Sequence, residues 1–243
     1  MKIDLVCLGV GKGATYVMKG WPSTAFAILI DGEPKILIDA GAGIALSCQR
    51  HLGKIPGTIY ITHNHMDHTG DLPILIGSTD TRPGKPRILG HPEVLEIVKT
   101  YRMHDPATNV NEQAEWITPD TNGLIYVGWD LYIKPIKTKH TYTCYGFVLK
   151  FGEKDIWGYS ADSPYDEDLF TMVTKPPIAV IDARDKATYD HPSFEEVESF
   201  VRKVPNCSIW LVHYEQTKFV SSIANMNLMY EGQKIRLFSC KED

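Results

Sequence analysis

The sequence predicts an α/β fold in which two β-sheets carry helices on their outer faces. Short apolar or β-branched runs typical of strands recur along the chain, and several are followed by a polar loop and a helical stretch. No linker rich in Pro, Gly or Ser, low-complexity tract or internal repeat interrupts this order. With 243 residues and 43% hydrophobic content, we expect residues 1–243 to form a single domain.

Strand-like runs in the N-terminal half occupy residues 2–8, 24–30, 35–39, 58–62 and 87–89. The turn-forming sequence DGEP joins the second and third runs into a hairpin. Helices are expected at 44–52 and at 92–101, where a proline occupies the first turn. The run at 58–62, TIYIT, predicts a buried strand that leads directly into His63. We interpret the polar segment 104–120 as a loop.

Strands of the C-terminal half are expected at 145–151, 155–159, 178–181 and 208–212. The first two form a hairpin across the sequence GEK. Helices are expected at 166–173 and 193–204, and each strand delivers polar residues at its C-terminal end. The periodicity of 219–233 is too weak to assign.

Composition limits the class of protein. Apolar runs are far shorter than the ~20 residues of a membrane-spanning helix. The N-terminus lacks the pattern of a secretory signal, and the five cysteines are scattered, without a C-x-x-C pair. We therefore expect a soluble cytoplasmic protein. A net charge of −5 weighs against stable binding of nucleic acid and favours a small substrate.

A dense group of metal-ligand residue types occupies the run THNHMDHTG. On an extended segment, residues two apart point the same way, so His63 and His65 can converge on one ion. Asp67 and His68 follow where the chain turns and can face a second ion. This spacing differs from the helical H-E-x-x-H zinc motif. The alternative is a polar surface loop.

HNHMDH matches the HxHxDH signature of the metallo-β-lactamase superfamily, which the chain resembles over nearly its whole length. Later positions also fit: His140 in KTKHTYTCYGF, Asp162 in YSADSP and His213 in WLVHYE. LGVGKGATYVMKGWPSTAFAILI and LIDAG are similar to the N-terminal part of the ribonuclease Z branch, and HPSFEEV from His191 resembles that branch's extra histidine. The resemblance implies an αββα sandwich of two mixed β-sheets packed face to face with outer helices.

The same resemblance implies two divalent metal ions. One would be held by His63, His65 and His140, and the other by Asp67, His68 and His213, with Asp162 as a bridge. Zinc is the default, although manganese, iron or cobalt also suits such ligands. Asp39 is expected to hold in place the ligand loop, which is the segment 63–68 that carries the first ligands. As catalytic groups, Asp67 would orient water and His191 would donate a proton to the leaving oxygen or clamp the phosphate; alternatively, His191 only caps a helix.

Other features carry less chemical information. We expect His51, His91 and His104 to be structural or solvated. The glycines at 9, 11 and 13 do not match a dinucleotide or P-loop motif. Tyr142, Tyr145 and Trp129 could stack on a base, although aromatic residues beside strands more often belong to the core.

Within the resemblance, the compact organisation is similar to that of phage-encoded anti-Pycsar enzymes, which destroy cyclic mononucleotide signals of host immunity. It implies a phosphodiesterase that converts 3′,5′-cyclic mononucleotides with several bases into linear monophosphates. Immune evasion in the host cytoplasm and a homodimer are implied in the same way.

Three alternatives stay open. A tRNA 3′-end endonuclease of the ribonuclease Z type normally carries a long, glycine-rich basic arm, where this chain offers only the polar segment 104–120. A hydrolase of esters, lactones or lactams would use the same ligands. A metal-retaining binding module without catalysis is the third alternative.

Overall fold

The chain forms two units, each built around one mixed sheet, in this computed structural model. The structure describes residues 1–78, 84–104 and 109–240. The first unit comprises Met1–Pro119 and Tyr230–Asp243, and the second comprises Asp120–Met229. Two mixed sheets with helices are therefore present, as expected from the sequence, and each described sheet has seven strands.

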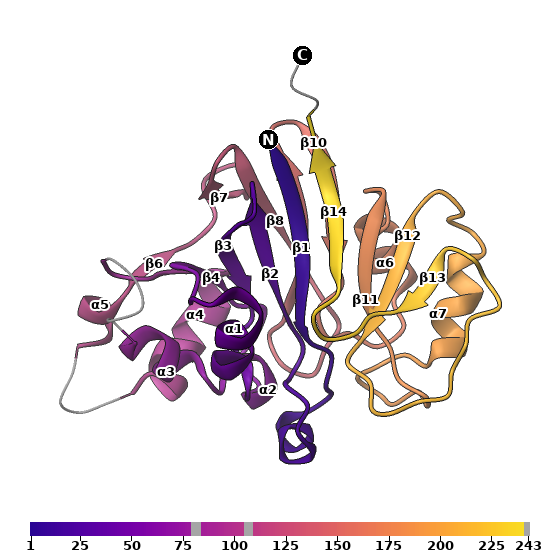
Figure 1. Cartoon of the computed structure of the whole chain (residues 1–243), viewed down its shortest axis with the longest axis horizontal. Coiled ribbons are helices and arrows are strands. Elements are labelled where there is room, and N and C mark those ends of the chain that lie inside the picture. The colour runs from indigo at the N-terminus through magenta and orange to yellow at the C-terminus, as the bar shows by residue number, and fades with distance from the viewer. Residues whose placement is uncertain (79–83, 105–108, 241–243) are drawn as a thin grey trace. The chain divides into compact units, whose positions relative to one another are not determined.

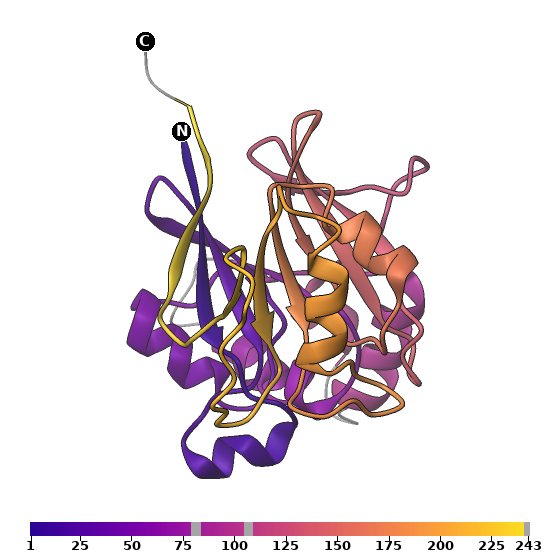
Figure 2. The same cartoon turned by 90° about the vertical axis from the view of Figure 1, so that its right-hand side faces the viewer.

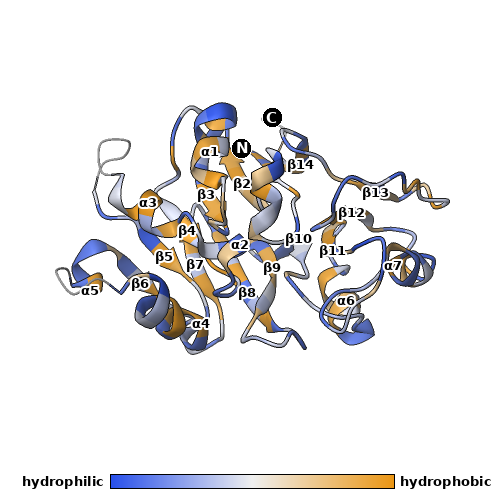
Figure 3. Cartoon of the chain, turned by 90° about the horizontal axis from the view of Figure 1, so that it is seen from below, coloured by the Kyte–Doolittle hydropathy of each residue, from blue (hydrophilic) through white to orange (hydrophobic). Residues whose placement is uncertain are grey.

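The sheet of the first unit has the order β14-β1-β2-β3-β4-β5-β6. Its strands are β1 (Lys2–Gly9), β2 (Ala25–Ile30), β3 (Glu33–Ile38), β4 (Thr58–Tyr60), β5 (Arg87–Leu89), β6 (Glu115–Ile117) and β14 (Lys234–Ser239). Pairing is antiparallel from β14 to β3 and parallel from β3 to β6. Figure 1 draws β14 next to β1, so both ends of the chain join this sheet. All of β2 is buried, and Figure 3 shows β2 and β3 largely in the colour of hydrophobic residues.

The helices of the first unit are α1 (Ile44–Leu52), α2 (Met66–Thr69), α3 (Leu72–Gly77), α4 (Pro92–Ile97) and α5 (Val110–Gln113), with a 3-10 helix η1 (Ala14–Lys19) and a π-helix η3 (Val98–Arg102). The expected helix at 92–101 is therefore α4 continued by η3. The prediction of a loop at 104–120 was wrong, because α5 and β6 lie within it; residues 105–108 are outside the described part.

The sheet of the second unit has the order β13-β12-β11-β10-β9-β8-β7. Its strands are β7 (Ile125–Gly128), β8 (Leu131–Lys137), β9 (Tyr145–Phe151), β10 (Lys154–Tyr159), β11 (Ile178–Asp182), β12 (Ser208–Val212) and β13 (Met226–Leu228). Pairing is antiparallel from β7 to β10 and parallel from β10 to β13. Because the carboxyl ends of parallel strands meet at one edge, the loops after β10, β11 and β12 begin close together.

Two helices cover this sheet, α6 (Glu167–Val173) and α7 (Phe194–Val201), drawn in orange beside the strands in Figure 2. Phe170 and Phe200 pack with Ile181 of β11 and Leu211 of β12 in one buried apolar cluster. Ser193 and Glu196 form a capping box that fixes the start of α7, which ends at Val201 and is shorter than predicted. This packing holds α7 against the sheet.

Among the residues described, no helix reaches the length and apolarity that crossing a bilayer requires.

Candidate metal centre

In the first unit, the loop after β4 gathers three imidazole rings. The ring of His63 lies 4.7 Å from that of His65 and 4.1 Å from that of His68, centroid to centroid. The chain turns into α2 between them, and the backbone N–H of His68 donates to the carbonyl of His65. Asp67 belongs to the same turn, with its Oδ2 atom 3.8 Å from Nε2 of His68. The four residues singled out in the sequence thus lie together within this unit.

A carboxylate from the end of β3 fixes the orientation of this loop. Oδ2 of Asp39 lies 2.8 Å from Nδ1 of His68, and the backbone N–H and hydroxyl of Thr62 donate to the same carboxylate. Burial raises the pKa of Asp39, although His68 and Thr62 act in the opposite direction. With Nδ1 of His68 engaged by a carboxylate, Nε2 is the nitrogen that a metal ion would use, an arrangement common for ligand histidines.

Two backbone contacts hold Asp67. Its Oδ2 atom accepts a hydrogen bond of 2.8 Å from the backbone N–H of Gly13, a residue with φ of +69°. A Cβ atom on Gly41 would lie 1.8 Å from the carbonyl oxygen of Asp67, so only glycine allows this approach. The glycine-rich segment after β1 therefore positions a carboxylate within the first unit.

In the second unit, loops after three strands supply His140, Asp162 and His213. Nδ1 of His213 lies 2.8 Å from Oδ1 of Asp162. The hydroxyl of Thr138 donates to the carbonyl of Asp162 at 2.9 Å and accepts from the backbone N–H of His140 at 3.3 Å. Burial lowers the pKa of His140, opposed by Asp162 and Asp190. His213 has φ of +66°, a conformation that a non-glycine residue rarely adopts.

His191 joins this second group. Its ring centroid lies 5.6 Å from that of His140 and 5.0 Å from that of His213. Nδ1 of His191 lies 2.5 Å from Oδ2 of Asp182, the last residue of β11. Nη2 of Arg184 lies 2.7 Å from Nε2 of His191 and 3.3 Å from Nε2 of His213.

Asp182 and Arg184 were not predicted from the sequence. The only signal was that each strand delivers polar residues at its C-terminal end, and IDAR at the end of β11 belongs to no common motif.

The histidines expected to be structural have varied surroundings. Nε2 of His51 lies 2.9 Å from a carboxylate oxygen of Glu231 at the surface. His91 occupies the N-cap position of α4, and His104 is exposed. Of the three aromatic residues considered for base stacking, Tyr145 is buried and Trp129 lies in the turn after β7. Tyr142 is 62% exposed, with its ring centroid 6.2 Å from that of His140.

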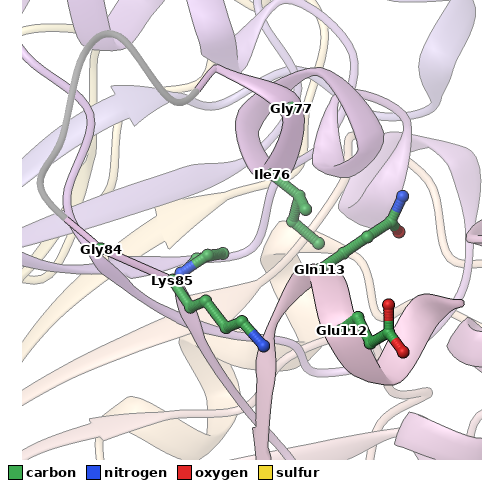
Figure 4. A pocket seen from close by; sticks show the side chains of 7 residues that line it. Ile76, Gly77, Gly84, Lys85, Glu112 and Gln113 are labelled. Carbon is green, nitrogen blue, oxygen red and sulfur yellow. The ribbon is translucent and has the colours of Figure 1, made fainter. Parts of the chain in front are cut away.

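A cavity in the first unit has a different lining. Ile76, Gly77, Gly84, Lys85, Glu112 and Gln113 are labelled around it in Figure 4. Of the candidate ligands, none lines this cavity, and it carries no functional assignment.

The donor atoms fit divalent metal ions. Imidazole nitrogens combined with carboxylate oxygens are typical ligands of zinc and similar ions. In the second unit, ligand atoms of Asp162, Asp182, His191 and His213 all lie within 4.8 Å of one another, as do those of His140, Asp190 and His191. Buried groups of histidine and aspartate are thus present, consistent with a binuclear site, and they do not identify the metal.

Comparison with known families gives a match over most of the chain. The family model described as anti-Pycsar protein Apyc1 matches residues 3–235. Ribonuclease Z of Treponema pallidum strain Nichols is 29% identical over 157 residues, which cover 62% of this chain and 49% of that protein. The chain thus spans about half the length of the curated relatives it matches.

Solved structures show the fold. The metallo-β-lactamase fold protein YhfI from Bacillus subtilis superposes with a TM-score of 0.79 at 16% identity, over 97% of this chain and 100% of that one. A diphosphatase of the PhnP family gives a TM-score of 0.73 at 18% identity, over 97% of each chain. At these identities the likeness concerns the fold alone, which is the metallo-β-lactamase fold.

Proposed function

Because the chain belongs to the anti-Pycsar Apyc1 family, which degrades cyclic nucleotides, we propose that it is a metal-dependent phosphodiesterase for 3′,5′-cyclic mononucleotides. The products would be linear nucleoside monophosphates, and several bases would be accepted. The family match over residues 3–235 is the observation that carries this proposal. Removal of cyclic nucleotide signals in the host cytoplasm would serve immune evasion.

The proposed ligands come from both groups of side chains. His63, His65 and His140 would hold one ion, and Asp67, His68 and His213 the other, with Asp162 between them. This requires residues 1–243 to act as a single domain. The contact of Asp39 with His68 supports the assignment, because metal-bound histidines commonly donate their second N–H to a carboxylate that is not itself a ligand. We propose zinc as the metal, with manganese as a substitute.

When bound, such ions neutralise charge on phosphate oxygens and make water nucleophilic at neutral pH. The side chains perform the remaining tasks. The hydrogen bond from Gly13 holds Asp67 in one orientation, so that its carboxylate can orient water. His191, which Asp182 holds through Nδ1, is the group to pass a proton to the leaving 3′ oxygen. A cyclic nucleotide is a small monoanion, so few contacts would suffice.

The test is product analysis. Purified protein with zinc or manganese is incubated with 3′,5′-cyclic AMP, GMP, CMP and UMP, and the products are separated by chromatography. We expect linear monophosphates from several of them. Asp162→Ala should abolish turnover while the folded protein remains. No hydrolysis of any cyclic nucleotide by metal-loaded protein would contradict the proposal.

The second candidate is tRNA 3′-end processing, favoured by the match to ribonuclease Z of Treponema pallidum. The net charge of −5 argues against tRNA processing, because phosphate backbones are bound mainly by clustered Lys and Arg. Efficient trimming of a precursor tRNA, with no activity on cyclic nucleotides, would establish this function instead.

We propose a homodimer, which the resemblance to the ribonuclease Z branch implies. Sedimentation of the protein at several concentrations measures its mass, and a monomer at all concentrations would contradict the proposal.

A further inference from the structure

Arg184 occupies an unusual position in the second unit. Its backbone N–H donates to the carbonyl of Pro192 at 3.0 Å, and its carbonyl accepts from the N–H of Phe194 at 2.8 Å. These two bonds tie it to the segment that starts α7. The backbone of Arg184 is therefore anchored next to the start of α7.

The guanidinium lies between two imidazole rings. Its Nη2 atom is 2.7 Å from Nε2 of His191 and 3.3 Å from Nε2 of His213. Arginine stays protonated in proteins and can only donate, so both Nε2 atoms must accept. Each Nδ1 atom then carries its proton toward a carboxylate, Asp182 for His191 and Asp162 for His213. These contacts all require the same tautomer in both rings, with the proton on Nδ1.

A metal ion on His213 would change this arrangement, and the role of Arg184 inferred from that change rests on the proposed function. The lone pair on Nε2 of His213 cannot serve a metal ion and Arg184 at once. The guanidinium would then release His213, and it would also release His191 when Nε2 of that ring carries the proton for the leaving oxygen. Its Nε atom is buried and, among the described residues, has no hydrogen-bond partner. N–H groups of Arg184 would therefore be left without an acceptor.

From these contacts we infer that Arg184 binds the phosphate group of the substrate. A guanidinium presents parallel N–H donors that match two phosphate oxygens, and its charge is independent of pH. The ligand class is a phosphate mono- or diester, and inorganic phosphate is the simplest probe. The positive clamp considered for His191 in the sequence belongs to Arg184, whereas His191 keeps the proton transfer.

The first test is phosphate binding to metal-loaded protein from which excess metal has been removed. Calorimetric titration with inorganic phosphate compares wild type, Arg184→Gln, Arg184→Lys and Arg202→Gln. Arg202 is the matched control, because it is an exposed arginine of the same unit that bonds to Ser222. We expect Arg184→Gln to weaken phosphate binding about 10- to 100-fold, since a charge-assisted hydrogen bond is lost. Arg184→Lys should retain part of the affinity, and Arg202→Gln should equal wild type.

Metal content separates direct binding from a structural role. Elemental analysis and chelator competition should show that Arg184→Gln keeps its metal, with affinity equal to or above wild type, because a competing cation near His213 is gone. Unchanged phosphate affinity in Arg184→Gln would overturn the inference. So would loss of metal together with loss of phosphate binding in both Arg184 variants, because Arg184 would then act through His213.

Activity gives an independent readout. With a cyclic nucleotide, Arg184→Gln should lower kcat/KM by at least the factor seen for phosphate binding, and added guanidinium ion should restore part of it. If the wild type hydrolyses no cyclic nucleotide, the proposed function fails, and the phosphate titration still decides the role of Arg184.

Discussion

Nδ1 of His191 lies 2.5 Å from Oδ2 of Asp182. The other oxygen of this carboxylate is 3.7 Å from Nδ1 of His213. The hydroxyl of Ser160 accepts a hydrogen bond of 3.0 Å from the backbone N–H of Asp182. This bond fixes the end of β11. One carboxylate thus sets the orientation and tautomer of His191.

The variant Asp182→Asn tests whether Asp182 sets the orientation and tautomer of His191. The amide can donate to Nδ1 of His191, which would move the ring proton to Nε2 and oppose the donor of Arg184. We expect kcat for cyclic nucleotides to fall about 10²- to 10⁴-fold, the range associated with loss of acid–base catalysis. Steady-state kinetics measure the fall, and thermal unfolding checks that the variant is folded. A variant with kcat near the wild-type value would show that Asp182 does not position His191.

Asp39→Asn tests the carboxylate of the first unit. It removes the charge opposite Nδ1 of His68, so the ring becomes a weaker and less well oriented ligand. Loss of such a contact typically costs about 10- to 100-fold in metal affinity. Competition with a zinc chelator measures the effect. Asp31→Asn, in the turn after β2, is the control and should bind zinc like the wild type. If Asp39→Asn and Asp31→Asn bind zinc with the same affinity, this result would argue against a metal ion at His68.

Gly41→Ala tests the close approach of the chain to the ligand loop. The added methyl group would lie 1.8 Å from the carbonyl oxygen of Asp67, so the loop must move. We expect reduced metal content and a loss of about 2 kcal/mol or more in unfolding free energy, as for overpacked core sites. Gly57→Ala is the matched control, because nothing lies within 4 Å of its added Cβ atom. Similar stability of the two variants would contradict this prediction.

The ion pairs of Asp4 predict a pH-dependent stability. Burial raises the pKa of Asp4, but bonds to Arg236 and Lys234 of β14 outweigh this and hold its pKa below the ordinary value. A depressed pKa contributes stability above the unfolded-state pKa, and this contribution is lost as pH falls through the folded-state pKa. Asp4→Asn should cost about 1 kcal/mol at pH 7, as for partly exposed pairs. Urea unfolding of metal-free protein at pH 7 and pH 3 should show the difference shrinking at the lower pH; a constant difference would contradict the assignment.

The sequence predicted well what local pattern determines. Strands with long apolar runs are confirmed, as at β9 and β12, and the HNHMDH run lies together because its ligand types are close in the chain. The strands β6, β7, β8, β13 and β14 were not predicted. β6 and β13 have three residues each, and β14 exists because it pairs with β1 from the other end of the chain. Such pairing leaves little trace in local periodicity.

Asp182 and Arg184 show the same limit within the site. Aspartate and arginine are common, and neither lies in a recognisable motif. Asp182 comes near His213 because the parallel register of β11 and β12 aligns Asp182 with Val212, one residue before His213. That register follows from the packing of whole strands, which a single sequence does not reveal.

From the position of Tyr142 we predict where the base of the substrate binds. Its ring is 62% exposed and lies 6.2 Å from the ring of His140, beside the proposed ligands of the second unit. Stacking of a base on an aromatic ring is worth about 1–3 kcal/mol, so Tyr142→Ala should raise KM for cyclic nucleotides about 5- to 150-fold with little change in kcat. Tyr142→Phe should retain the wild-type KM.

The control for Tyr142 is Tyr126→Ala, which removes another exposed tyrosine of the same unit, paired with Tyr132. Its KM should equal that of the wild type. Steady-state kinetics with purine and pyrimidine substrates would show a larger effect of Tyr142→Ala on the purines, because their larger rings stack over more area. Equal KM values for Tyr142→Ala and Tyr126→Ala would mean that the base is bound elsewhere.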